Sequence, residues 1–326
     1  MKEEKVMIHQ EHTVFDEMER CTICPRGCRA DRLLGKTGRC HVDAGIKVAR
    51  AALHMWEEPC ISGQEGSGAV FFSGCSLGCI FCQNREISGG KSGQVIAVER
   101  LAEIFLELQE QKANNINLVT AGHYVPQVCR ALQLAKDKGL RIPIVYNSSG
   151  YEKTGTLQML ENLVDIYLPD LKYLDPELAA KCSKAEDYPQ FAKQAIAEMV
   201  RQQPQPQFDE RGIMTKGVIV RHLLLPGHVK EAKKIVQYLY ETYGDQIYIS
   251  MMNQYTPVEQ VAEDPLLGRR VTRREYERLL DFAGELGVTQ GFYQEGKTAM
   301  ESFIPQFDCE GVLKSDRLSK ERKQGE

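Results

Sequence analysis

The sequence predicts an α/β protein built around a mostly parallel sheet. From about residue 68 onward, short apolar runs alternate with segments of helical periodicity, which is the pattern that βαβ units produce. Most runs are apolar at nearly every position, as expected of parallel strands covered on both faces. Their irregular spacing leaves a barrel and a doubly wound sheet equally open. The predicted strands are 69–74, 116–120, 142–146, 165–170, 217–225 and 247–252, with a weaker one at 291–294.

Three of the intervening segments repeat apolar residues at helical spacing, which predicts helices with one buried face. They lie within residues 98–108, 232–239 and 276–283. Thr272 precedes the last of them and Glu275 follows three residues later. This spacing predicts a capping box at the start of that helix.

Length and composition indicate a globular protein. The chain has 326 residues, 42% of them apolar, and a formal net charge of −4. No apolar run approaches the ~18 residues that a membrane span needs, and the first twenty residues lack the apolar core of a secretory signal. The nearly balanced charge gives no indication of a nucleic-acid partner. We therefore expect a cytoplasmic protein of one large domain with a smaller attachment.

Cysteine usage is the strongest chemical signal in the sequence. Seven of the 11 cysteines fall into two tight groups. In a chain without a secretory signal, clustered thiols indicate metal ligands rather than disulfides. One group, Cys75, Cys79 and Cys82, directly follows the first predicted strand. Ligands of α/β proteins bind at that end of a strand.

Three thiolates on one loop can hold three irons of a [4Fe–4S] cluster, which normally takes four. The fourth iron then stays open and can chelate the amino and carboxylate groups of S-adenosylmethionine. An electron from the reduced cluster would break a C–S bond of this cofactor and give a carbon radical. The competing interpretations are part of a zinc site, or an electron-transfer cluster completed by Cys60 or another distant thiol.

The stretch GSGAVFFSGCSLGCIFCQNREISGG, residues 66–90, resembles the radical S-adenosylmethionine (SAM) superfamily. More narrowly, it resembles the activating enzymes of glycyl radical enzymes, such as pyruvate formate-lyase activating enzyme. The resemblance extends over residues 65–300. It implies an incomplete (β/α)6 TIM-like barrel, here carrying a small N-terminal Cys-rich metal-binding extension. The predicted organisation is a leader (1–20), a Cys-rich segment (21–64), the partial barrel (65–305) and a charged tail (306–326).

The resemblance also implies which residues contact SAM. Where the family carries a Gly-Gly-Glu motif after the second strand, this chain has Thr120-Ala121-Gly122-His123, so Thr120 takes that place. It further implies a monovalent cation beside the cofactor, with Asp170 as acidic ligand and Asn147 where the family has Asp. The implied cofactor-binding residues are Thr120, Asn147, Ser148, Asp170, Arg221 and Tyr255.

The residues themselves support some of these roles better than others. Arg221 lies in an apolar strand, and a buried guanidinium needs a partner, which favours a site role. Asp170 fits equally well as a helix N-cap. His222 points to the opposite strand face and is expected to be structural, and His123 fits either a site or a structural role. His54, Glu57 and Glu58 are candidates for the cavity mouth.

The second cysteine group opens with a C-x2-C pair. Four thiolates fit either a structural zinc or a second Fe–S cluster, and the spacing does not separate the two. Five basic residues nearby would balance the charge of such a site: Arg26, Arg29, Arg32, Lys36 and Arg39. The four predicted ligands are Cys21, Cys24, Cys28 and Cys40.

Three functions follow as hypotheses. In the first, the chain cleaves SAM reductively and the 5′-deoxyadenosyl radical abstracts hydrogen from a glycine of a partner glycyl radical enzyme. In the second, the same chemistry modifies a small molecule or a peptide. In the third, the chain is a non-catalytic iron–sulfur or zinc protein. The catalytic hypotheses require an electron donor such as flavodoxin or ferredoxin.

Overall fold

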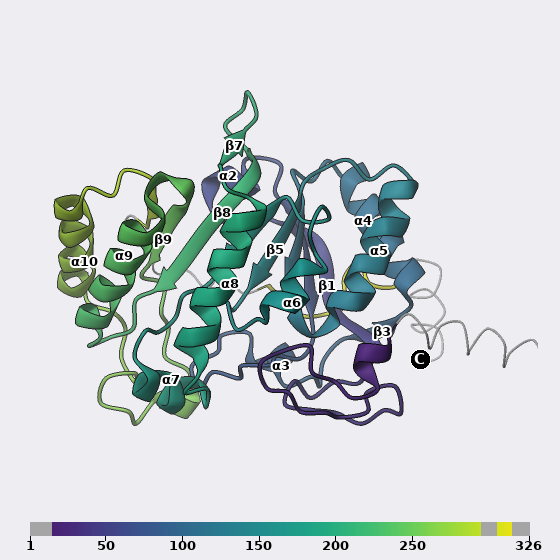
Figure 1. The fold of residues 1–326 in the computed structure, drawn as a ribbon, viewed down its shortest axis with the longest axis horizontal. Helices are drawn as coiled ribbons and strands as arrows, with labels where there is room; N and C mark the ends of the chain where they lie inside the picture. Colours follow the sequence, from purple (N-terminus) through teal and green to yellow (C-terminus); the bar gives the residue numbers. More distant parts are fainter. Residues whose placement is uncertain (1–14, 295–304, 315–326) are drawn as a thin grey trace, which may run out of the picture.

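The computed structural model describes residues 15–294 and 305–314. The predicted leader and the charged tail therefore lie largely outside the described residues. Within them, one sheet dominates (Figure 1). Its parallel part consists of β2 (Ser67–Phe72), β4 (Ile116–Val119), β5 (Ile144–Ser148), β6 (Ile166–Pro169), β8 (Met214–Leu223), β9 (Tyr248–Met252) and β10 (Gly291–Tyr293).

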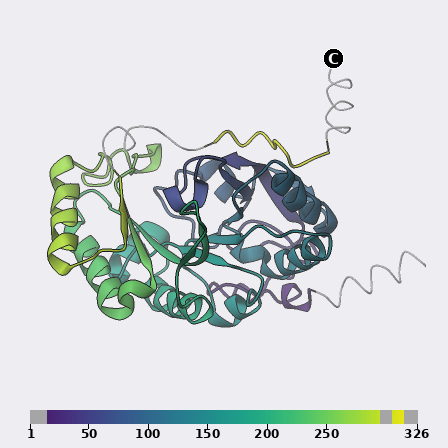
Figure 2. The ribbon, with the colours of Figure 1, turned by 90° about the horizontal axis from the view of Figure 1, so that it is seen from above.

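The order of these strands decides between a barrel and a doubly wound sheet. The parallel strands follow one another in space as they do in sequence, without the reversal that defines a doubly wound sheet. Each right-handed crossover adds its strand on the same side of the previous one, so all the covering helices lie on one face of the sheet. Figure 2 shows the resulting curved sheet with helices along its outer side. Because β2 pairs with β1 (Ile46–His54) on its free side, the barrel is not closed.

The outer helices form where apolar residues repeat at helical spacing. The predicted helices correspond to α4 (Val98–Glu110), α9 (Val229–Tyr243) and α10 (Arg273–Leu286). The capping box of Thr272 and Glu275 is confirmed. Four helices had no individual prediction: α5 (Val125–Asp137), α6 (Thr154–Gln158), α7 (Pro176–Ser183) and α8 (Tyr188–Gln202).

Short elements fill the connections. Strand β1 lies inside the Cys-rich segment and joins the sheet antiparallel to β2, and β3 (Gln94–Ile96) extends the sheet beyond β1. Strand β7 (Gln207–Phe208) pairs with β8. The remaining short elements are η1 (Asp16–Met18), α2 (Pro59–Ser62), α3 (Arg85–Ser88), η2 (Gly122–Tyr124), η3 (Gly244–Gln246) and η4 (Glu259–Val261).

The core lies between the strands and the helices. Every residue of β2, β4, β5 and β6 is buried, as the uninterrupted apolar runs predict. The N-terminal segment 21–44, purple in Figure 1, lies along the same end of the sheet as α3 and α7. Within the described residues, no helix combines the length and the apolar character needed to cross a membrane.

Candidate functional site

The loop between β2 and α3 carries Cys75, Cys79 and Cys82, and all three line one cavity. Gly74 allows this loop to turn, because its φ of +94° is one that side chains rarely adopt. A Cβ at Gly74 would also lie 2.7 Å from the carbonyl oxygen of Cys40. The cysteine loop and the N-terminal segment therefore pack so closely that only glycine fits between them.

The thiols of this loop suit a cluster better than a single ion. Within residues 15–294 and 305–314, no three His, Cys, Asp or Glu side chains are grouped to hold one metal ion, either at this loop or at the four N-terminal cysteines. A [4Fe–4S] cluster does not require the three sulfurs to converge on one ion, because each thiolate binds a different iron. The amide of Leu77 donates to Cys75 Sγ at 3.4 Å, and Ser183 Oγ donates to Cys79 Sγ at 3.0 Å. Donors aimed at the sulfurs fit thiolate ligands.

Burial governs the protonation of two thiols of this loop. It raises the pKa of Cys82 to about 12, and it also raises the pKa of Cys75. These two thiols would therefore have to lose their protons when they bind a metal at neutral pH. Thiolate formation and cluster assembly are thus coupled at this loop.

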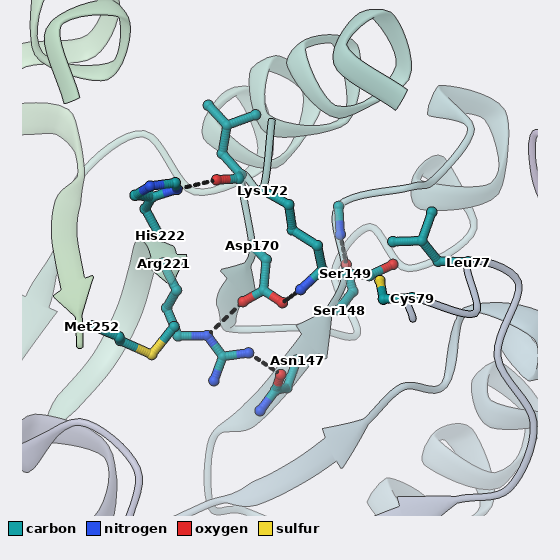
Figure 3. Close-up of polar contacts among 12 residues, drawn as sticks. Leu77, Cys79, Asn147, Ser148, Ser149, Asp170, Lys172, Arg221, His222 and Met252 are labelled. Atoms are coloured by element: carbon teal, nitrogen blue, oxygen red, sulfur yellow. Dashed lines mark hydrogen bonds and ion pairs between the residues drawn. The ribbon is translucent and has the colours of Figure 1, made fainter. Parts of the chain in front are cut away.

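Arg221 of β8 is the centre of a polar network in the same cavity (Figure 3). Its Nε donates to Asp170 Oδ1 at 3.0 Å, and its Nη2 donates to Asn147 Oδ1 at 2.6 Å. Its Nη1 lies 3.2 Å from Glu57 Oε2. These residues come from the ends of β5 and β6 and from the connection after β1, so the parallel topology and the added strand assemble the network together.

Lys172 completes the charge balance of this network. Its Nζ donates to Asp170 Oδ2 at 2.6 Å. Burial alone would raise the pKa of Asp170, but Lys172 and Arg221 outweigh it and hold that pKa below its usual value. Burial raises the pKa of Glu57, while Arg221 opposes the rise and the amides of Asn117 and Asn147 also donate to this carboxylate. Two basic side chains therefore face Asp170 and Glu57, and the buried carboxyl of Glu58 also lies near Arg221, with its pKa raised by burial.

The other predicted cofactor contacts have different outcomes. Thr120 and Ser148 line the cavity, and Thr120 has a φ of +61°, uncommon for a residue with a Cβ. Tyr255 does not line it: its side chain is buried and its hydroxyl donates to the carbonyl of Leu267 at 2.7 Å. The loop after β9 turns Tyr255 into the core, and its neighbours Gln254 and Thr256 face the cavity instead.

The structure also shows where His123, His222 and the residues predicted at the cavity mouth lie. The Nε2 of His123 lies 2.8 Å from the carbonyl of Ser73, and the Nδ1 of His222 lies 2.8 Å from that of Leu171, so both rings are buried and bonded to backbone. His54 and Glu57 line the cavity, whereas Glu58 is buried outside its lining. Gln83, Ser149 and Lys172 also line the cavity; the resemblance covers the segments that contain them, but none of the three was assigned a role in the site.

The four cysteines of the N-terminal group surround a second, small pocket. Arg32 also lines it, and its guanidinium is only 1% exposed. Its N–H groups donate to the carbonyls of Asp43 and His123, and Nη1 lies 3.8 Å from Cys21 Sγ. In the described part of the chain no carboxylate lies within ion-pair distance of Arg32. A buried guanidinium is costly without an anion, and metal-bound thiolates at this site would supply one.

An open barrel of parallel strands with a cysteine-rich loop at its carboxyl edge defines the class to which this protein belongs. The radical SAM superfamily model matches residues 69–239, and the chain belongs to that superfamily. Membership implies a [4Fe–4S] cluster, SAM and a source of electrons. The chain is also 27% identical over 273 residues to uncharacterized protein MJ0674 of Methanocaldococcus jannaschii, which covers 81% of this chain and 74% of that protein.

Several solved structures resemble parts of the fold. A domain of pyruvate-formate lyase-activating enzyme from Bacteroides vulgatus has a TM-score of 0.38 at 11% identity, covering 53% of this chain and 92% of that domain. SuiB of Streptococcus suis has a TM-score of 0.48 at 15% identity, covering 74% of this chain and about half (53%) of SuiB. Methylornithine synthase (PylB) has a TM-score of 0.47 at 14% identity, covering 74% and 69%.

Proposed function

We propose that this chain uses Cys75, Cys79 and Cys82 to hold a [4Fe–4S] cluster and binds SAM in the adjoining cavity. The observation that carries the proposal is the convergence of three thiols and the Arg221 network on that cavity. When bound, the two groups supply one-electron cleavage of the sulfonium to a 5′-deoxyadenosyl radical, which takes a hydrogen atom from the substrate. The protein's contribution is to bind, orient and shield the reactants.

The donors and acceptors of the Arg221 network suit the methionyl end of SAM. That group carries an amine, which must be unprotonated to bind the open iron, and a carboxylate. Asp170 and Glu57 offer acceptors for the N–H groups of the amine, and Arg221 and Lys172 offer donors for the carboxylate. Thr120 and Ser148 add polar atoms along the same wall. A monovalent cation beside Asp170 is the further role that the resemblance implies.

The proposed substrate is a glycine of a partner glycyl radical enzyme. The support is the cysteine-loop sequence, residues 66–90, which resembles the activating enzymes of that class. We also propose residues 65–305 as the catalytic unit, 21–64 as its metal-binding extension, and flavodoxin or ferredoxin as the type of electron donor. The proposed compartment is the cytoplasm.

One observation favours a smaller substrate as the second candidate. The connection after β1 brings His54, Trp56 and Glu57 into the cavity lining. Glu57 reaches across to β4 and β5, where Asn117 and Asn147 donate to it. This connection forms part of the cavity wall beside the strands. We infer that a small molecule or a peptide side chain fits a cavity walled on this side more readily than a folded loop does.

Anaerobic reconstitution tests the chemistry. The purified chain should bind iron and sulfide, and after reduction with dithionite it should convert SAM to 5′-deoxyadenosine. Cys79→Ala should lose one cluster's iron and all of this activity, whereas Cys129→Ala, a buried thiol on α5, should retain both. A fully loaded wild-type protein that forms no 5′-deoxyadenosine would contradict the proposal.

The target is tested separately with any glycyl radical enzyme that the same genome encodes, and a genome that encodes none would contradict the glycine target. Incubation with the reduced, SAM-bound protein should produce a glycine-centred radical detectable by electron paramagnetic resonance (EPR). If 5′-deoxyadenosine forms but every such enzyme stays radical-free, the glycine target is wrong and the small-substrate candidate stands.

A further inference from the structure

Cys79 is the end of a buried chain of hydroxyl groups. Ser183 Oγ donates to Cys79 Sγ at 3.0 Å, and Tyr173 Oη lies 2.9 Å from Ser183 Oγ. When Cys79 is a thiolate it can only accept, so the single hydrogen of the Ser183 hydroxyl goes to the sulfur and Tyr173 is then the donor to Ser183. Both residues are fully buried. The chain therefore runs in one direction, from Tyr173 through Ser183 to the sulfur.

The backbone of Ser183 is held from the N-terminal segment. Helix α7 ends at Ser183, because Lys184 takes a left-handed conformation with φ of +50°. The carbonyls at a helix end have no partner in the helix. Here the guanidinium of Arg26 donates hydrogen bonds to them. Its Nη2 donates to the carbonyl of Ser183 at 2.9 Å, and its Nη1 donates to the carbonyl of Lys184. Arg26 stands between Cys24 and Cys28.

The same guanidinium also binds the cysteine loop. Its Nε donates to the carbonyl of Ser76 at 2.9 Å and its Nη2 to that of Leu77 at 3.2 Å. The guanidinium lies over the ring of Tyr151, 5.1 Å from its centre. One side chain thus fixes the loop that carries Cys79 and the residue that donates to Cys79, relative to each other.

We propose that Ser183 raises the reduction potential of the cluster through its hydrogen bond to Cys79, and that Arg26 is the positioning residue that keeps this bond in place. The inference rests on the proposed cluster at Cys75, Cys79 and Cys82. A hydrogen bond to a ligating sulfur stabilises the more negative, reduced cluster. The N-terminal segment, whatever metal it holds, would thereby act on the ease with which the catalytic cluster accepts an electron.

The test is an EPR-monitored redox titration of the reconstituted protein. Ser183→Ala should make reduction about tenfold less favourable, which is about 59 mV for a one-electron couple. Ser183→Thr keeps the hydroxyl and should restore the potential. Ser67→Ala is the matched control, because Ser67 is equally buried but its hydroxyl donates to Asn115. A Ser183→Ala potential equal to that of the control would overturn the proposal.

Two further variants distinguish a change in the reduction potential of the cluster from a loss of the cluster. Tyr173→Phe keeps Ser183 and removes its donor, so it should shift the potential in the same direction by a smaller factor. Arg26→Lys should also lower the potential while the iron and sulfide of the catalytic cluster stay at the wild-type level. An unchanged potential in both variants would contradict the positioning role. A wild-type protein that binds no cluster would instead refute the proposed function, and the iron and sulfide assays reveal this before any titration.

Discussion

Arg221 and Asp170 form an ion pair between two neighbouring parallel strands, with Nε of the guanidinium 3.0 Å from Oδ1 of the carboxylate. Their backbones also form a β-bridge, so the pair is positioned by the sheet itself. Asp170 is therefore not a helix N-cap: α7 begins later, and Asp175 caps it. The ion pair is thus held by residues whose backbones are joined in the sheet.

The first prediction concerns this pair. Arg221→Lys removes the planar fork that contacts Asp170, Asn147 and Glu57, and a lysine offers only a point charge. We expect SAM affinity to fall at least tenfold, about 1.4 kcal/mol, with cluster iron unchanged. Anaerobic titration calorimetry measures this. Arg201→Lys, in a half-exposed ion pair, is the control, and equal affinities in the two variants would rule out the role of Arg221.

The second prediction concerns the buried charge of Arg32. Arg32→Met removes the cation that lines the pocket of the four N-terminal cysteines. A tetrathiolate metal site is negative and loses its buried counter-charge in this variant. We expect the metal of this site to be lost or bound more weakly, while the cluster at Cys75, Cys79 and Cys82 stays. Metal analysis of zinc and iron per chain measures both, with Lys138→Met, at an exposed lysine after α5, as control.

The third prediction concerns Gly74. Gly74→Ala forces a Cβ to within 2.7 Å of the Cys40 carbonyl and places alanine at a φ of +94°. We expect unfolding to become easier by about 1–3 kcal/mol and cluster iron to drop. Gly155→Ala is the control, because its Cβ would meet nothing within 4 Å. Urea unfolding monitored by circular dichroism compares the two, and wild-type stability in Gly74→Ala would show that the contact is not tight.

The fourth prediction concerns pH. Burial lowers the pKa of His222 to about 4 from its ordinary value of 6.5. The unfolded chain therefore binds this proton first, so His222 contributes stability above pH 6.5 that is lost as the pH falls towards 4. His222→Asn keeps a donor for the Leu171 carbonyl and does not titrate. Between pH 7 and pH 5 the wild type should lose about 2 kcal/mol more than this variant.

Urea unfolding at several pH values provides the measurement for His222. The buried His123 titrates in the same direction, so it contributes equally to both proteins and cancels in the comparison. Parallel pH profiles for wild type and His222→Asn would mean that burial of the ring has no net effect on its pKa.

Local sequence patterns carried much of this description. Apolar runs and helical spacing located the strands of the parallel sheet and helices α4, α9 and α10, because each pattern depends only on which face of an element is buried. The chain separation of Thr272 and Glu275 likewise predicted a cap that forms within one helical turn. The cysteine spacing placed three thiols on one loop for the same local reason.

Other features had no local signal. Strand β1 lies in a segment whose glycines, charges and cysteines hide its periodicity, and only pairing with β2 makes it a strand. Glu57 was a candidate for the cavity mouth, but its contact with Arg221 depends on the connection after β1. The contact of Lys172 with Asp170 and the position of Tyr255 depend on the turns after β6 and β9. None of these placements follows from the residues next to them in the chain.

By itself, the sequence determined the chemistry that is available: two sets of thiols, a strand-borne arginine and a parallel sheet. The tertiary structure alone decided that Arg221 meets Asp170 and Glu57, and that Arg26 reaches Ser183. The physical reason is the separation along the chain over which each interaction acts. Periodicity and capping act within a few residues, whereas these contacts join groups 51 to 164 residues apart, and only the winding of the strands brings such groups together.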